Sequence, residues 1–121
     1  MSLARKMSDQ HESYLAGRLG WKVQPGSGNQ WAKQGDVVGN RYEDPYAFTF
    51  DCKATRGNSI GVTADMWEKV QEQAGGNRPA LALRWYGDDH LRRVRHDLVV
   101  ISLEDFIELL EEADGRGTER G

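Results

Sequence analysis

The stretch from Phe48 to Ala54, FTFDCKA, constrains this chain more than any other. Aromatic, β-branched and small residues predominate in it, and such a composition predicts a short buried strand. Successive side chains of a strand point to opposite faces. The apolar side chains at the even positions from 48 to 54 are therefore predicted to share a core face, and Asp51 and Lys53 to lie together on the opposite face.

Asp51 and Lys53 form a charged pair in an otherwise apolar strand. Such a pair costs desolvation free energy unless it finds partners. We interpret a divalent metal ion as the partner of Asp51. The alternative is a structural ion-pair network in a small α/β scaffold. Cys52 lies between the two but points to the core face, so we expect a buried, inert thiol rather than a nucleophile.

Size and composition indicate one soluble globular domain. The chain has 121 residues, of which 38% are hydrophobic and 29% charged, as in ordinary single domains. We expect a single domain over residues 1–113 and a flexible tail over the Gly- and charge-rich residues 114–121. The single cysteine excludes an internal disulfide and suits a reducing cytoplasm. We also expect no membrane span, which needs about 20 apolar residues, and no signal peptide.

The rest of the sequence predicts alternating helices and strands. Helices are expected at 8–19, 63–74 and 104–113, and further strands at 21–23, 35–39, 80–86 and 98–102. Ser8 or Asp9 is the expected N-cap of the first helix, and Thr63 of the second. This order of elements predicts an α/β fold whose central mixed sheet of four or five strands is flanked by helices on both sides.

Two further acids are placed near Asp51 by this pattern. Asp36 opens the strand at 35–39, which is expected to form a hairpin with the strand at 47–54 and so to bring Asp36 near Asp51. Glu12 lies three residues before Leu15, on the predicted inward face that Leu15 and Leu19 mark. A solvated glutamate that complements the helix dipole is an equal alternative for Glu12.

The order of these residues resembles the PD-(D/E)XK nuclease superfamily: Glu12 on a helix, Asp36 at a strand start and Asp51-x-Lys53 on the next strand. Within it, the pattern is most similar to Holliday junction resolvases of archaeal and phage type. The resemblance covers about residues 8–86 and includes the loop GSGN at 26–29. Gly35 stands where the superfamily name has proline, and this change removes no ligand. The resemblance implies a restriction-endonuclease-like core and a metal-dependent endodeoxyribonuclease that hydrolyses phosphodiester bonds in branched DNA.

The residue types suit this chemistry. Mg²⁺ prefers oxygen ligands and retains several waters, so Asp36 and Asp51 are the predicted direct ligands, and Glu12 is a third, which can act through water. Mn²⁺ is expected to substitute. Lys53 is predicted to stabilise charge in the transition state rather than to act as a base, because neighbouring anions hold it protonated. The predicted catalytic set is thus Glu12, Asp36, Asp51 and Lys53.

The predicted partner of this site is DNA. Ser27, Asn29, Lys33 and Arg56 are expected to bind substrate phosphates, and Gln71 or Gln73 is a weaker candidate for the same role. The net charge of −3 weighs mildly against a nucleic-acid binder, but six acids are concentrated in residues 104–114. The turn at 88–90, DDH, is expected to be solvated rather than a metal site.

The two-fold symmetry of a four-way junction predicts a symmetric homodimer, in the cytoplasm of a bacterial, archaeal or phage-infected cell. Two alternatives remain open on the same fold. One is a repair or restriction-like DNA nuclease with another substrate preference. The other is a DNA-binding module without catalysis.

Overall fold

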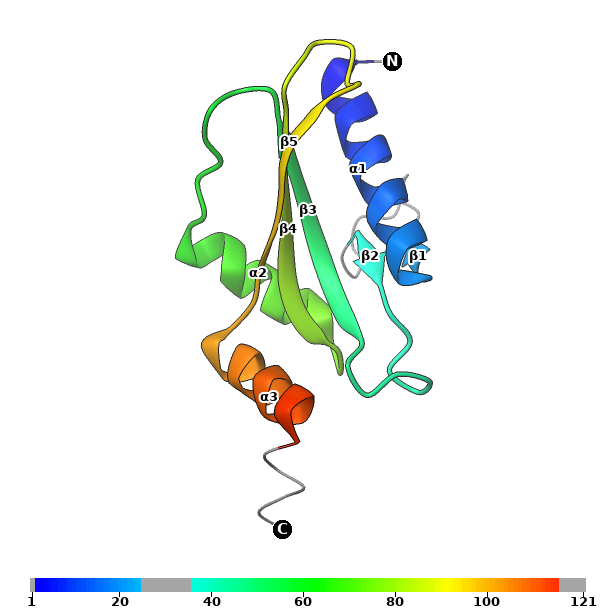
Figure 1. The fold of residues 1–121 in the computed structure, drawn as a ribbon, viewed down its shortest axis with the longest axis vertical. Helices are drawn as coiled ribbons and strands as arrows, with labels where there is room; N and C mark the ends of the chain where they lie inside the picture. The colour runs from blue at the N-terminus through cyan, green and yellow to red at the C-terminus, as the bar shows by residue number, and fades with distance from the viewer. Residues whose placement is uncertain (1, 25–35, 116–121) are drawn as a thin grey trace.

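A computed structural model describes residues 2–24 and 36–115 of the chain. Its elements are α1 (Leu3–Leu19), β1 (Lys22–Val23), β2 (Val37–Val38), β3 (Phe48–Thr55), α2 (Ala64–Ala74), β4 (Arg78–Tyr86), β5 (Val94–Val100) and α3 (Leu103–Asp114). The strands form one five-stranded sheet in the order β1-β2-β3-β4-β5 (Figure 1). The predicted α/β fold with a mixed central sheet is therefore confirmed.

The pairing of the strands explains why the sheet is mixed. β3 and β4 are parallel, with Asp51 opposite Leu81 and Lys53 opposite Leu83, and α2 provides the crossover that a parallel pair requires. The other neighbours are antiparallel, including the predicted hairpin between β2 and β3, in which Val37 lies opposite Phe50. The hairpin fixes Asp36 beside the middle of β3.

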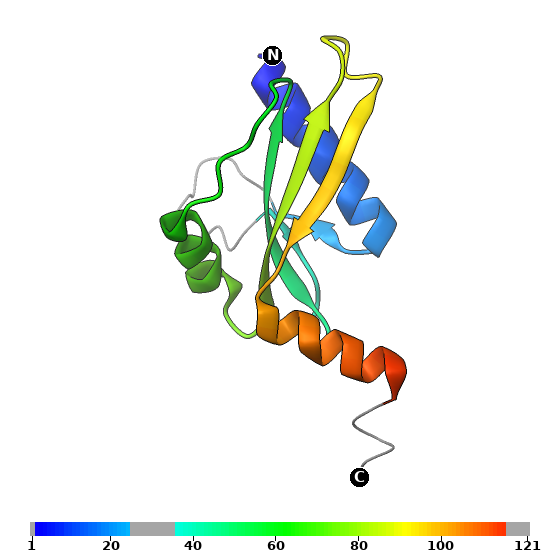
Figure 2. The same cartoon turned by 60° about the vertical axis from the view of Figure 1, so that its left-hand side comes forward.

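Helices cover the two faces of the sheet and bury two hydrophobic clusters. On one face, Ala16 of α1 packs in a cluster with Phe48 and Phe50 of β3. On the other, Val70 of α2 packs with Leu81 and Leu83 of β4. Figure 2 shows α1 and α2 on opposite sides of the strands and α3 at the end of β5. The alternation predicted for β3 is confirmed on its core face, because Cys52 is also buried in the first cluster.

α1 is longer than predicted, and the expected N-cap at Ser8 or Asp9 is wrong. The hydroxyl of Ser2 caps the helix by accepting a hydrogen bond from the Arg5 N–H at 3.1 Å. Residues 3–7 are mostly good helix formers, so the helix continues back to that cap. The C-cap is Gly20, with a left-handed φ of 71°, which favours glycine.

The inward face of α1 also differs from the prediction. His11 and Ala16 are its buried residues, whereas Leu19 is 41% exposed. Leu15 is half-buried and packs against the core. The helix therefore turns a histidine, rather than its last leucine, towards the sheet.

The later elements follow the sequence more closely. Thr63 caps α2 through the Met66 N–H, as predicted. The strand expected at 98–102 is instead β5, at Val94–Val100, because residues from 94 on pair with β4 and Ser102 serves as the N-cap of α3. No helix in the described ranges has the length and hydrophobicity needed to cross a membrane.

Candidate active site

A cavity of about 610 Å³ lies between α1, the residue before β2 and the middle of β3. All four predicted catalytic residues line it: Glu12, Asp36, Asp51 and Lys53. They come from three elements that are separate in the sequence, so the fold itself assembles this group. Other residues of the wall are Ser8 and Asp9 of α1, Gln24 after β1 and Lys69 of α2.

Asp36 is held rigidly directly before the start of β2. Its backbone N–H donates a hydrogen bond of 2.8 Å to the Phe50 carbonyl, and its Oδ2 accepts one of 2.8 Å from the Cys52 N–H. The carboxylate thus accepts a hydrogen bond from the β3 backbone just beyond the Val37–Phe50 pair, with which β2 begins. Only 6% of Asp36 is exposed, so its position is set by the sheet rather than by solvent.

Asp51 lies against Asp36 and shares its buried environment. Burial raises the pKa of the Asp51 carboxyl above its ordinary value, and a hydrogen bond with the Asp36 side chain and the charge of Asp36 raise that pKa further. Lys53 opposes the shift. Two carboxyl groups in contact cannot both ionise without nearby positive charge. The pair is therefore suited to sharing a proton or to holding a cation.

Lys53 brings a positive charge next to this pair. Its Nζ lies 3.5 Å from Asp51 Oδ2, and the side chains of Lys53 and Asp51 are 39% and 12% exposed. The prediction that the two lie side by side on one face of β3 is confirmed. Because much of the amine remains open to solvent, it can also meet a group that enters the cavity.

Glu12 faces the same cavity from the middle of α1. It is half-buried, and the helix begins nine residues earlier, at Leu3. The alternative interpretation of Glu12 as a solvated glutamate of the first turn is therefore wrong. Within residues 2–24 and 36–115, no group of three His, Cys, Asp or Glu side chains is placed to hold a metal ion. Asp36 and Asp51 are in contact, and Glu12 shares the cavity with them.

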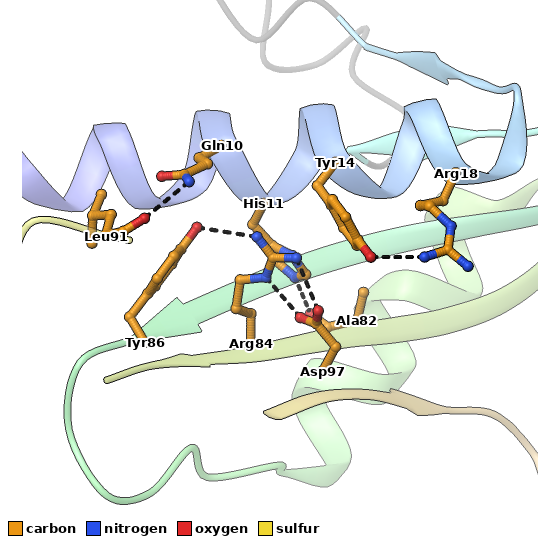
Figure 3. A network of polar contacts seen from close by, with 9 residues as sticks. All are labelled: Gln10, His11, Tyr14, Arg18, Ala82, Arg84, Tyr86, Leu91 and Asp97. Carbon is orange, nitrogen blue, oxygen red and sulfur yellow. Dashed lines mark hydrogen bonds and ion pairs between the residues drawn. The ribbon is translucent and has the colours of Figure 1, made fainter. Parts of the chain in front are cut away.

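A buried polar network anchors α1, and with it Glu12, to the sheet (Figure 3). His11 Nε2 lies 3.1 Å from the Ala82 carbonyl. Beside it, the buried Arg84 makes two hydrogen bonds to Asp97, of 2.7 and 2.9 Å, and its guanidinium lies 4.5 Å from the ring centre of Tyr14 on α1. This network was not predicted from the sequence, because its members are spread over three elements.

Burial is the main reason why the pKa of His11 lies below its ordinary value, and the charge of Arg84 lowers it further. The hydrogen bond to Ala82 and the charges of Asp97 and Asp36 oppose this shift. Because the Ala82 carbonyl can only accept, Nε2 carries the proton of the neutral ring. Nδ1 is then an acceptor, and it is buried without a hydrogen-bond partner in the described structure.

Lys69 is a residue of the cavity that sequence reasoning missed. It directly precedes Val70, the fully buried residue of α2, and the β3-α2-β4 crossover places α2 on the face of the sheet opposite Phe48 and Phe50. Asp51 and Lys53 were predicted for that same face. The position of Lys69 next to the buried residues of the crossover helix was therefore the sequence signal that could have predicted its place in the cavity.

Other predicted residues lie elsewhere. Arg56 does not line the cavity and forms an ion pair of 2.6 Å with Asp89. Gln71 and Gln73 do not line it either. Asp88 accepts hydrogen bonds from the backbone N–H groups of Arg92 and Arg93. Ser27, Asn29 and Lys33 lie outside the described residues.

The donor set fits Mg²⁺. Carboxylate oxygens are the ligands this ion prefers, and Asp36 and Asp51 bring two carboxyl groups together in a buried place where their mutual repulsion needs compensation. Glu12 adds a third carboxylate to the wall of the same cavity.

Comparison with known proteins gave no match. No family model matches the chain, and no curated protein or solved structure matches it significantly. The functional interpretation therefore depends on the site itself.

Proposed function

We propose that this protein is a metal-dependent endodeoxyribonuclease that hydrolyses phosphodiester bonds in branched DNA, in the manner of a Holliday junction resolvase, and that it acts as a homodimer. The observation that carries the proposal is the contact between Asp36 and Asp51, with Lys53 beside them and Glu12 in the same cavity. These are the four residues on which the resemblance to PD-(D/E)XK nucleases depends.

Each residue has a distinct role in the proposed reaction. Asp36 and Asp51 would hold Mg²⁺, with Glu12 as a third carboxylate on the cavity wall. Bound there, the ion supplies Lewis-acid stabilisation of phosphoryl charge and lowers the pKa of a bound water. The Cys52 N–H fixes the Asp36 carboxylate, so this ligand needs little reorganisation during the reaction.

Lys53 is proposed to stabilise charge on the phosphate. Its amine is next to Asp51 and partly exposed, so a phosphate that enters the cavity meets a positive charge adjacent to the carboxylates. A phosphodiester is already an anion and gains further negative charge in the transition state, so the positive amine stabilises the transition state more than the ground state. We propose this electrostatic role for Lys53 rather than a general-base role.

The charge distribution supports DNA as the substrate despite the net charge of −3. Arg5, Lys53 and Lys69 line the cavity. The acids of residues 104–114 lie on α3, which does not contribute to the cavity wall. Phosphate contacts by lysine and arginine supply most of the non-specific affinity for DNA, and here they are local to the site.

The proposal includes a dimer in a reducing cytoplasm. A four-way junction has two-fold symmetry, and paired cuts call for two sites related by the same symmetry. The chain has a single cysteine, Cys52, which is buried, and a chain without an internal disulfide suits a reducing compartment.

Cleavage of labelled DNA on denaturing gels tests the proposal. Purified protein is incubated with a four-way junction, a flap, linear duplex and single strands, each with Mg²⁺, Mn²⁺ or chelator. We expect metal-dependent, symmetric nicks near the branch point, which Asp51→Asn abolishes. Asp65→Asn, an exposed acid in the first turn of α2, is the matched control and should cleave normally.

The other outcomes assign other functions. Cleavage of flaps or linear duplex in place of junctions keeps the metal site and indicates a repair or restriction-like nuclease. Tight DNA binding without cleavage indicates a non-catalytic module. If the protein neither binds nor cleaves DNA, Asp51 and Lys53 are a structural ion pair and the proposal is wrong.

A further inference from the structure

α3 presents an apolar stripe to solvent. Leu103, Phe106, Ile107 and Leu110 are spaced at i, i+3, i+4 and i+7, which places them on one side of the helix, and Leu103 and Phe106 are 69% and 49% exposed. The helix is attached to the body of the protein by other residues: Asp105 and Glu108 bind Arg78, and Leu109 packs against the core. The stripe is thus not the side that holds α3 in place.

β5 lies at one edge of the sheet as the structure describes it, and all of its residues except Val100 are exposed. It is the last strand of the sheet and pairs only with β4 among the described residues. Leu98 lies opposite Leu83 and Val99 opposite Ala82, so these neighbours point to opposite faces, yet they are 53% and 54% exposed. An edge strand with exposed apolar residues and free backbone groups favours pairing with another strand.

The exposed apolar surface of the protein is concentrated in these two elements. Twelve large hydrophobic side chains are strongly exposed among the described residues, and seven of them lie on β5 and α3. Figure 2 shows α3 following directly from the end of β5. An apolar concentration of this kind marks an interaction site more often than a surface exposed by chance.

The charges at the two ends of β5 are complementary. Arg92 and Arg93 precede the strand and are exposed, and the exposed acids Glu104 and Glu111 lie on the helix that follows it. If two β5 strands pair antiparallel, the basic end of one lies beside the acidic end of the other. A second copy of the same chain can therefore form hydrogen bonds with the backbone edge, contact the exposed apolar residues and pair with the charges.

We propose that the free edge of β5 and the apolar stripe of α3 form the interface with a second copy of this chain, through antiparallel β5–β5 pairing about a two-fold axis. The contact is isologous, since the same surface is used by both copies. This inference locates the dimer that the proposed function requires, and the association itself needs neither DNA nor metal.

Analytical ultracentrifugation with chelator and without DNA measures the association. The wild-type protein should be a dimer at micromolar concentration, and Phe106→Glu should raise the dimer dissociation constant by at least about tenfold, because it places a charge in an apolar contact. Val62→Glu is the matched control, since Val62 is 45% exposed on the loop before α2, and it should leave the dimer intact. Circular dichroism checks that each variant is folded.

A charge exchange tests the antiparallel arrangement directly. One variant carries Arg92→Glu and Arg93→Glu, and the other carries Glu104→Arg and Glu111→Arg. Each should dimerise poorly alone, because like charges then face each other. Mixed in equal amounts, they should form a heterodimer, since both contacts regain opposite charges.

Three results would overturn this inference: a wild-type protein that stays monomeric, a Phe106→Glu variant that dimerises normally, or charge variants that fail to associate on mixing. None of them depends on cleavage. A monomer that cuts DNA would contradict the proposed interface and leave the proposed nuclease function intact. A dimer that cuts no DNA would contradict the proposed function and leave the interface intact.

Discussion

The two sides of the sheet treat polar and apolar groups in opposite ways. Beside β2, two carboxylates are 6% and 8% exposed, and one of them is fixed by a backbone N–H of the neighbouring strand. At β5, Leu98 and Val99 are more than half exposed. Acids are thus buried at positions where apolar side chains would be more favourable for folding. Apolar side chains are exposed at positions where polar ones would be equally compatible with folding.

We propose that both places are shaped by binding rather than by folding alone. Burial of two acids in contact is unfavourable for the isolated chain, as is exposure of many large apolar side chains on neighbouring elements. A bound cation would compensate the buried acids, and a second copy of the chain would cover the exposed apolar side chains. The comparison can be tested by substitutions that act on one side of the sheet only.

The largest effect is expected for Asp51→Asn. Cleavage should fall by about a thousandfold, equivalent to about 4 kcal/mol of transition-state stabilisation. Stability of the metal-free protein should instead rise, by about 1 kcal/mol at neutral pH, because the substitution removes the repulsion between two buried carboxylates. Single-turnover cleavage and urea unfolding with chelator measure the two effects.

The sign follows from the raised pKa of Asp51. The folded protein retains its proton to higher pH than the unfolded chain, so stability is greatest below the ordinary pKa and is lost as pH rises through the folded value. Asp51→Asn should flatten this part of the stability profile. A variant that is both less active and less stable would instead indicate a structural ion pair.

The next effect compares a buried leucine of β4, Leu81, with an exposed leucine of β5, Leu98, which lie two residue pairs apart in the β4–β5 ladder. Leu81→Ala removes a fully buried side chain and should cost about 3 kcal/mol of unfolding free energy. Leu98→Ala removes a side chain that is 53% exposed and should cost the monomer less than about 0.5 kcal/mol. Urea unfolding of both in the monomeric Phe106→Glu background makes the measurement independent of dimerisation.

If Leu98→Ala destabilises that background as much as Leu81→Ala, then β5 is part of the core and the apolar edge is not a free surface. If it weakens only the dimer of the wild-type background, the exposed leucine acts in association. The pair of variants thus separates folding from assembly on the β5 side.

The sequence predicted most of the site because the signal is local there. Asp51 and Lys53 follow from strand alternation, and Asp36 from a hairpin between neighbouring strands. Glu12 was harder, since its orientation depends on where α1 begins, and the Ser2 cap lies outside the periodic part of the helix. Lys69 and the network of His11 and Arg84 were missed because they meet the other residues only through tertiary contacts.

The β5 edge was the least predictable part of the fold. Its first half, RHD at 95–97, is polar, and such a sequence is a poor strand former by itself. Arg84 makes it a strand by binding Asp97 across the β4–β5 pair. Pairing with β4 thus overrides the low strand propensity of residues 95–97. The sequence of this segment alone cannot reveal such pairing.

A smaller effect is expected from the buried His11. Its pKa is lowered mainly by burial, so the unfolded chain binds a proton more readily than the folded protein. Stability is then fully present above the ordinary pKa of 6.5 and is lost as pH falls through the folded value. We therefore expect the unfolding free energy to fall between pH 7.5 and pH 5 because of this residue.

Urea unfolding of wild type and His11→Gln over this pH range checks the effect. Glutamine retains a donor for the Ala82 carbonyl but does not titrate, so its stability should vary less with pH. Equal slopes for the two proteins would mean that His11 keeps the same protonation on folding.

The smallest effect is expected from Lys69, which sharpens the comparison at the cavity itself. Lys69→Ala should weaken binding of DNA by Asp51→Asn protein by a few-fold, about 1 kcal/mol, and reduce the salt dependence of binding by about one phosphate contact. Lys69→Arg should keep both. If Lys69→Ala changes neither affinity nor salt slope while Lys53→Ala changes both, the substrate approaches from the α1 side of the cavity, and α2 contributes only its packing against the sheet.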